Sequence, residues 1–207
     1  FIIVTLYFLY KKNDIKNYMY IAILALSIIL YQITLSRTGF ICLLIILFLS
    51  ITLKYNIINR FKCISFLRYL PFILGCGIIL LSLLYDGNNQ VFIILDKLFS
   101  GRLYYNNLFL TQMPISILGV DMSILENADL FLDCGYVLLF LSHGIFVFAL
   151  FMYYTYKILK GINYRTDILF YIIVSVLIYC ITEYFLTNIL INYTLIYYNK
   201  FIFEEKS

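Results

Sequence analysis

The sequence predicts an all-α fold: a polytopic bundle of about six to seven transmembrane helices with an outer loop that contains short helices. Apolar residues make up 64% of the 207 residues and charged residues only 13%. Several apolar runs reach the roughly 20 residues that a helix needs to cross a bilayer core of about 30 Å. These runs are continuous, which is typical of membrane helices. The composition therefore favours an integral membrane protein over a soluble domain.

The chain opens partway into an apolar run, so residues 1–10 are predicted to be the tail of a helix. Residues 1–10 do not show the pattern of a charged leader and a small-residue cleavage site, so we expect a truncated membrane helix here rather than a signal peptide. We therefore expect residues 1–207 to form a single integral membrane domain that lacks the N-terminal helices of a longer protein.

Two helices are expected within the apolar region 18–53, because this region is too long for one span. They are predicted at residues 18–35 and 40–53, joined by a tight turn at Ser36, Arg37, Thr38 and Gly39. Three further spans are predicted at residues 69–85, 136–156 and 168–186. Residues 187–207 fit either a short re-entrant or interfacial helix or an imperfect final span.

Basic loops fix the predicted orientation. Residues 11–17, 54–68 and 157–167 hold most of the Lys and Arg residues, and the positive-inside rule places all three loops in the cytoplasm. Residues 86–135 and the turn at Arg37 then face the outside. This outer side is acidic, with Asp86, Asp96, Asp121, Glu126, Asp129 and Asp133. A short apolar patch at residues 91–98 is expected to lie at the membrane surface.

Two arginines stand out on this acidic side. Topology disfavours an outward cation near a helix end, so Arg37 suggests a specific anionic partner; the alternative is a side chain that snorkels to the headgroups. Arg102 is expected to begin a helix that has Ser100 as its N-cap and ends before Pro114. A bound anion would satisfy both the free N–H groups there and the arginine. The alternative is an exposed surface arginine.

Carboxylates accompany these arginines. If helical, Glu126, Asp129 and Asp133 share one face and could hold a divalent metal, although an acidic run in which Asp133 caps the next helix is favoured. Glu183 is a membrane carboxylate that could pair with Arg37 or Arg102. His143 is the only histidine and is more simply a buried residue satisfied by a neighbour. The five cysteines have no metal-ligand spacing.

Four short motifs in this order and topology resemble those of the Wzy-type polysaccharide polymerases, which make O-antigen, capsule or exopolysaccharide and share a superfamily with the O-antigen ligases. The motifs lie at residues 35–39, 100–103, 132–136 and 142–145. The resemblance extends over residues 18–183 and is to the C-terminal portion of such proteins. Many members have a His-Asn-x-Tyr-like stretch where this chain has Asp133, Cys134, Gly135 and Tyr136.

The resemblance implies a glycosyltransferase of the bacterial cytoplasmic membrane. Such enzymes join undecaprenyl-diphosphate-linked oligosaccharide repeat units at the outer face of the membrane and release the lipid diphosphate. Membrane lipid and a chain-length regulator of the same pathway are implied partners. Nucleic acid, a metal and a cofactor are not expected.

The resemblance also implies roles for particular residues. Arg37 and Arg102 would stabilise the diphosphate leaving group, because guanidinium groups bind phosphate oxygens bidentately. Asp133, or alternatively Glu183 or His143, would accept the proton of the acceptor sugar hydroxyl. Further candidates for substrate binding are Ser36, Gly101, Tyr104, Tyr105, Tyr136 and Glu183. The tyrosines would either stack on sugar rings or anchor the protein at the membrane interface.

Two other functions remain open. An O-antigen ligase-type transferase uses the same donor chemistry and differs in its acceptor. A non-enzymatic flippase or transporter of lipid-linked sugars would place charged groups along a central pathway formed by repeated halves. The predicted polar groups lie at one face, which favours a catalytic site at the outer surface.

Overall fold

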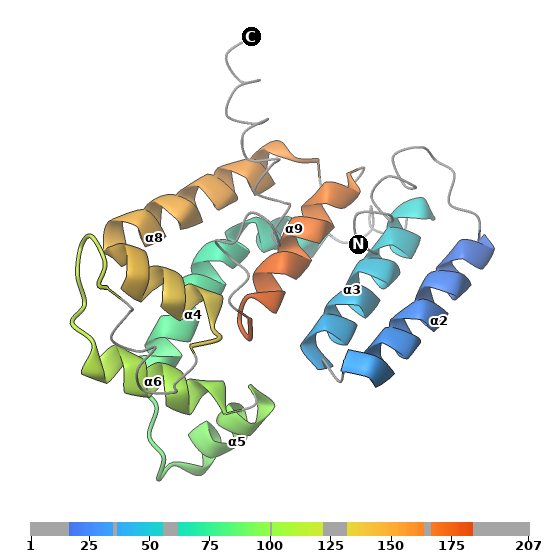
Figure 1. Cartoon of the computed structure of the whole chain (residues 1–207). Coiled ribbons are helices and arrows are strands. Elements are labelled where there is room, and N and C mark those ends of the chain that lie inside the picture. Colours follow the sequence, from blue (N-terminus) through green and yellow to red (C-terminus); the bar gives the residue numbers. More distant parts are fainter. Residues whose placement is uncertain are drawn as a thin grey trace. The chain divides into compact units, whose positions relative to one another are not determined.

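The computed structural model describes residues 17–34, 37–55, 62–99, 101–121, 132–163 and 167–183. All regular secondary structure within these ranges is helical, which confirms the all-α prediction (Figure 1). The chain forms two compact units. The first contains Phe1–Arg68 and Leu159–Tyr179, and the second contains Tyr69–Ile158 and Cys180–Ser207.

Two helices in the described residues are long and apolar enough to cross a membrane. They are Ser65–Leu83 and Gly135–Gly161, and each contains a window with a mean hydropathy of 2.0. Three other helices contain shorter apolar stretches of 10–17 residues, which are Tyr18–Ile29, Gly39–Thr52 and Ile168–Tyr179. The structure therefore supports two candidate spans, and the predicted six to seven are not confirmed.

The first unit contains α2 (Asn17–Thr34), α3 (Arg37–Lys54) and α9 (Ile168–Tyr179). Helix α3 packs against both α2 and α9 (Figure 1). The Tyr31 and Phe40 rings lie 5.0 Å apart between α2 and α3, and the Cys42 thiol donates to the Ser175 carbonyl at 3.6 Å.

The predicted pair of helices in this unit is confirmed, but two of the predicted boundaries change. Helix α3 begins at Arg37, so Gly39 lies inside a helix and the predicted turn over residues 36–39 is too long. Helix α9 ends at Tyr179, whereas the apolar run predicted a helix to residue 186. Glu183 therefore follows the helix and does not lie within it.

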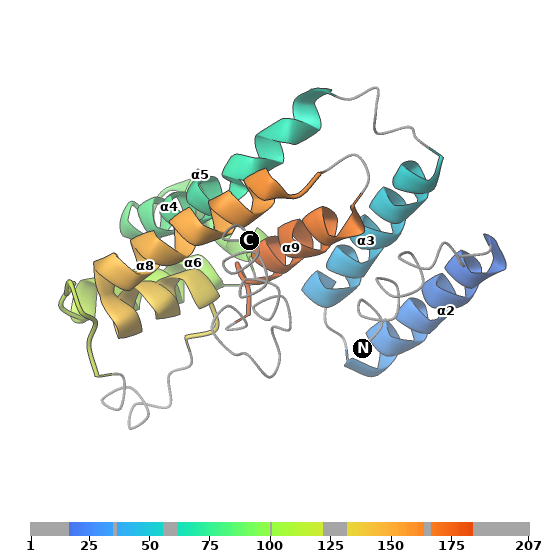
Figure 2. The ribbon, with the colours of Figure 1, turned by 90° about the horizontal axis from the view of Figure 1, so that it is seen from above.

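The second unit contains α4 (Leu70–Leu83), α5 (Gln90–Leu98), α6 (Arg102–Gln112) and most of α8 (Gly135–Gly161), and α4 follows the 3-10 helix η2 (Lys62–Tyr69). Helices α4 and α8 run side by side (Figure 2). Their contact is close because Gly75 has no side chain: a methyl group there would lie 2.9 Å from the Met152 sulfur. Helix α6 packs on α4, with the Asn107 amide donating to the Ser82 carbonyl at 2.8 Å.

Helix α8 is broken at Gly144, which was not foreseen by the prediction of one continuous helix over residues 136–156. Gly144 has φ 81° and ψ 173°, a backbone conformation that is essentially restricted to glycine. The segment 116–120, here called the clasp segment, supplies backbone partners to the break. Ile145 and Phe146 N–H donate to the carbonyls of Ser116 and Ile117 at 3.1 and 3.3 Å.

A third backbone bond completes this clasp, since Val120 N–H donates to the Leu141 carbonyl at 2.9 Å. The clasp segment and helix α8 approach each other so closely that a Cβ on Gly119 would collide with the Ser142 carbonyl. One on Gly144 would collide with the Ile117 carbonyl. The glycine at each position is therefore what allows the clasp segment to enter the break.

Candidate functional site

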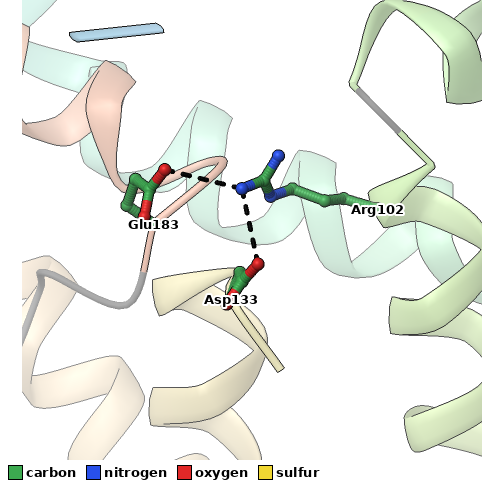
Figure 3. A network of polar contacts seen from close by, with 3 residues as sticks. All are labelled: Arg102, Asp133 and Glu183. Atoms are coloured by element: carbon green, nitrogen blue, oxygen red, sulfur yellow. Dashed lines mark hydrogen bonds and ion pairs between the residues drawn. The ribbon is translucent and has the colours of Figure 1, made fainter. Parts of the chain in front are cut away.

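Three charged side chains meet at one guanidinium nitrogen in the second unit (Figure 3). Nη2 of Arg102 lies 3.4 Å from Oδ2 of Asp133 and 3.5 Å from Oε1 of Glu183. These residues are far apart in the sequence, so the fold is what assembles them. We call this group the Arg102 triad.

Each member of the triad lies at the end of a helix. Arg102 is the first residue of α6, and Asp133 lies two residues before α8 begins. Glu183 follows the end of α9. A backbone bond of 3.0 Å from Gly135 N–H to the Cys180 carbonyl ties the start of α8 to the segment that carries Glu183. This bond joins the two segments whose carboxylates pair with Arg102.

The start of α6 is occupied by a carboxylate from the protein itself. Asp96 Oδ1 in α5 accepts the backbone N–H of Tyr104 at 3.0 Å. Gly101 is the N-cap, with φ 80°, and its N–H donates to the Asp96 carbonyl at 2.8 Å. The predicted cap, Ser100, lies outside the described residues. An anion bound at these N–H groups was one of two alternatives that the sequence left open. The N–H of Tyr104 is already bonded to Asp96, which supplies the negative charge that the helix dipole favours.

Burial and charge shape the triad's electrostatics. The side chains of Arg102, Asp133 and Glu183 are 20%, 43% and 33% exposed. Burial raises the pKa of Glu183; the attraction of Arg102 lowers it, and the repulsion of Asp133 raises it again. When both carboxyls are ionised, the triad has one more negative than positive charge. A proton on Glu183 neutralises the group.

Arg102 retains hydrogen-bonding capacity beyond the two carboxylates. Both ion pairs use Nη2, while Nη1 points away from Asp133 and Glu183 (Figure 3). Nε is buried and has no hydrogen-bond partner among the described residues. A guanidinium has five N–H donors, so Arg102 can bind an oxygen anion while it still holds a carboxylate.

The polar residues next to the triad are packed rather than open. Asn106 is buried one turn after Arg102 and its side chain is hydrogen-bonded to Cys134. Burial raises the pKa of the Cys134 thiol, so this cysteine is a neutral core residue. Tyr136 is 0% exposed, because its ring packs in the core at the start of α8. This ring has no face free for a sugar, whereas Tyr104 and Tyr105 are exposed on α6.

Four other predicted site residues lie either in the first unit or outside the described residues. Arg37 begins α3 in the first unit, and its side chain lies outside what the structure describes. Ser36, Glu126 and Asp129 also lie outside the described residues. The predicted acidic face can therefore be followed only at Asp133, which pairs with Arg102.

His143 lies at the break of α8, about 12 Å along the helix from Gly135 at 1.5 Å per residue. Ser142 Oγ donates to the Leu138 carbonyl at 2.6 Å and lies 2.6 Å from His143 Nδ1. Because the hydroxyl has one proton, Nδ1 of His143 is then the donor in the second bond. The histidine is exposed and forms a pair with Ser142 that is separate from the triad, so the expectation of a buried histidine is wrong.

Sequence reasoning missed three features around the site: Asp96 as the cap of α6, Asn106 as the partner of Cys134, and the clasp of Gly119 and Gly144. The glycine inside an apolar helix pattern was the available signal for the last of these. No protein-family model, curated protein or solved structure matches this chain. The geometry of the triad offers a cationic group and two carboxylates at a partly exposed site, which suits anion binding coupled to proton transfer.

Proposed function

We propose that this protein is a membrane-bound polysaccharide polymerase. It would join oligosaccharide repeat units carried on undecaprenyl diphosphate at the outer face of the bacterial cytoplasmic membrane, with release of the lipid diphosphate. The observation that carries the proposal is the Arg102 triad, which combines a phosphate-binding cation with two proton acceptors.

The membrane part of the proposal is supported by the two candidate spans and by the side chains that they expose. The second half of α8 exposes large apolar side chains to the surroundings, among them Phe146, Leu150 and Tyr153. The first half, by contrast, has Tyr136, Leu139 and Leu141 buried. Exposed apolar side chains are expected where a helix faces lipid. The clasp segment forms hydrogen bonds with backbone groups at the break in α8. A broken helix in a membrane requires such partners, because lipid supplies none.

Arg102 is proposed to stabilise the departing lipid diphosphate. As the bond between the sugar and the phosphate breaks, negative charge develops on the phosphate oxygen, and a fixed guanidinium stabilises that charge most in a partly dehydrated site. Nη1, which takes part in neither ion pair, can donate to a phosphate oxygen while Nη2 stays on a carboxylate. Asp133 and Glu183 thus hold the guanidinium in position before the substrate arrives.

One carboxylate is proposed to accept the proton of the acceptor hydroxyl. Burial raises the pKa of Glu183, which makes it a better proton acceptor than an ordinary carboxylate, and the sequence had offered it as an alternative to Asp133 in this role. Asp133 then serves as the residue that positions Arg102. In the step, the hydroxyl oxygen bonds to the anomeric carbon and its proton goes to Glu183. The bond to the diphosphate breaks and the lipid diphosphate leaves with the electron pair.

The test is a complementation experiment in a strain that lacks this protein and accumulates the lipid-linked repeat unit. The gene, with membrane levels checked, would carry Arg102→Ala, Arg102→Lys, Glu183→Gln or Asp133→Asn, and Lys160→Ala serves as the control for loss of an exposed cation. Wild type and control should restore a ladder of repeat units on a gel. Arg102→Ala should leave a single lipid-linked unit outside the membrane.

Other outcomes would overturn the assignment. If single units accumulate on the cytoplasmic side, the protein is a carrier of lipid-linked sugars. If polymer forms normally on the lipid but is not passed to its final acceptor, it is a ligase. A ladder in the Arg102→Ala strain at equal protein level would remove Arg102 from the chemistry.

A further inference from the structure

The helix α5 presents an apolar stripe that nothing in the described part of the chain covers. Val91, Ile94 and Leu98 are 63%, 60% and 72% exposed, and no residue of α5 is buried. Their spacing of three and four residues places them on one face of the helix. Lys97 lies beside this stripe, near the end of the helix.

The opposite side of α5 is engaged by the protein. Asp96 caps α6 through Tyr104 N–H, and the Phe92 ring packs edge-on against Tyr85 at 6.1 Å. Tyr85 in turn contacts Tyr104, so the two helices are joined through aromatic rings as well as through the cap. The apolar stripe is therefore held in a fixed orientation.

We propose that α5 lies in the lipid–water interface, with Val91, Ile94 and Leu98 inserted among the upper acyl chains, and that it thereby sets the depth of Arg102 at the level of the headgroups. Continuity with a candidate span supports a bilayer as the occupant. The span Ser65–Leu83 ends seven residues before α5 begins, and Leu84 is exposed at its end.

The chemistry of the neighbouring residues also suits a bilayer interface. Exposed tyrosines such as Tyr104 and Tyr105 are enriched at this depth, and the ammonium group of Lys97 can reach the headgroups while its stem covers apolar surface. Helix α5 carries one Asp and one Lys, so apolar insertion and not attraction to anionic lipid holds it. Binding should therefore persist on zwitterionic lipid.

This inference rests on the membrane location in the proposed function but not on its chemistry, and its test separates the two. The chain contains no tryptophan, so a single introduced indole reports its own surroundings. The full chain, carrying Ile94→Trp, Leu80→Trp or Asn88→Trp, would be reconstituted into phosphatidylcholine vesicles. Bromine atoms on the lipid would lie either near the headgroup end or near the tail end of the acyl chains. Leu80→Trp tests α4 as a span, and Asn88→Trp is the polar-turn control.

The expected result is quenching of Ile94→Trp that is stronger with bromine near the headgroup end, together with a blue-shifted emission and little quenching of Asn88→Trp. If bromine quenches the fluorescence of Leu80→Trp but not that of Ile94→Trp, the proposal of an interfacial helix is overturned, while the membrane location of the protein is retained. A blue shift of Ile94→Trp without bromine quenching would mean that a protein partner or second copy covers the stripe, which also overturns the proposal. If neither Leu80→Trp nor Ile94→Trp is quenched, the membrane location itself fails.

Discussion

Asp133 and Glu183 reach the same guanidinium nitrogen of Arg102, and the distances to Asp133 Oδ2 and Glu183 Oε1 are 3.4 and 3.5 Å. One cation is thus shared by two carboxylates that would otherwise repel each other. A change in the charge of any one member must alter the proton affinity of the others.

The triad predicts opposite pKa shifts for two substitutions. Arg102→Gln removes the attraction that lowers the pKa of Glu183, so this pKa should rise further. Asp133→Asn removes the repulsion that raises it, so the pKa should fall. The carboxyl stretching band in infrared spectra, assigned to Glu183 with Glu183→Gln, measures both shifts. Lys160→Gln should leave the band unchanged, and shifts of equal sign for Arg102→Gln and Asp133→Asn would contradict the proposed coupling.

Stability should depend on pH through Glu183. A carboxyl with a raised folded-state pKa binds its proton more readily when folded, so its contribution to the free energy of unfolding falls as pH rises from about 4.5, the ordinary value, through the raised pKa. The glutamine side chain of Glu183→Gln cannot ionise, so this variant does not lose stability through this group as the pH rises. The Tm of Glu183→Gln minus that of wild type, measured in detergent, should therefore increase with pH over this window. A difference that shrinks with pH would mean that Arg102 lowers the pKa overall.

Removing Arg102 should be costly to activity. Loss of one fixed donor to a developing oxyanion typically lowers kcat on the order of a hundredfold or more. Arg102→Ala should show a loss of this size in polymer formation by purified protein with a lipid-linked repeat unit. Arg102→Lys should recover only part of the activity, because an ammonium group cannot hold two carboxylates and a phosphate with planar geometry. Full activity of Arg102→Lys would show that charge alone is sufficient.

The clasp should be sensitive to one methyl group. Gly144→Ala places a Cβ on a backbone that only glycine adopts readily, at a cost of about 1–3 kcal/mol, before its collision with the Ile117 carbonyl is counted. Gly77→Ala is the matched control, since a Cβ there would meet nothing within 4 Å. It should be neutral or stabilising by up to about 1 kcal/mol, because alanine favours a helix over glycine. Denaturant midpoints of both variants measure the contrast, and equal effects would contradict the clasp.

The cap of α6 can be tested separately from the triad. Asp96→Ala removes the acceptor of Tyr104 N–H and should lower stability by about 1 kcal/mol. Asp96→Asn keeps a side-chain oxygen as acceptor and should retain most of that stability, losing mainly the interaction with the helix dipole. Thermal unfolding of both variants in detergent gives the comparison. An Asp96→Asn variant as unstable as Asp96→Ala would show that charge, not the hydrogen bond, stabilises this end.

The sequence by itself determined the helical class and the main helices. Continuous apolar runs and their interruptions predicted the helix pair α2 and α3, as well as α4 and α8, because helix length follows from where apolar residues stop. It also singled out Arg102, Asp133 and Glu183, since charged residues beside apolar runs are costly unless they are partnered. The number of spans and the C-terminal end of α9 were less well determined, because apolar residues continue past Tyr179 without a breaker.

Tertiary structure alone decided which of these residues meet. Arg102 could have paired with several carboxylates, and the fold places Asp133 and Glu183 beside it, with a backbone bond between Gly135 and Cys180 joining the two segments that carry them. The break at Gly144 depends in the same way on the clasp segment, whose backbone supplies the hydrogen bonds that the helix gives up. Local sequence encodes where a chain can bend or carry charge, but long-range backbone pairing fixes the partner, because that choice is a property of the packed fold.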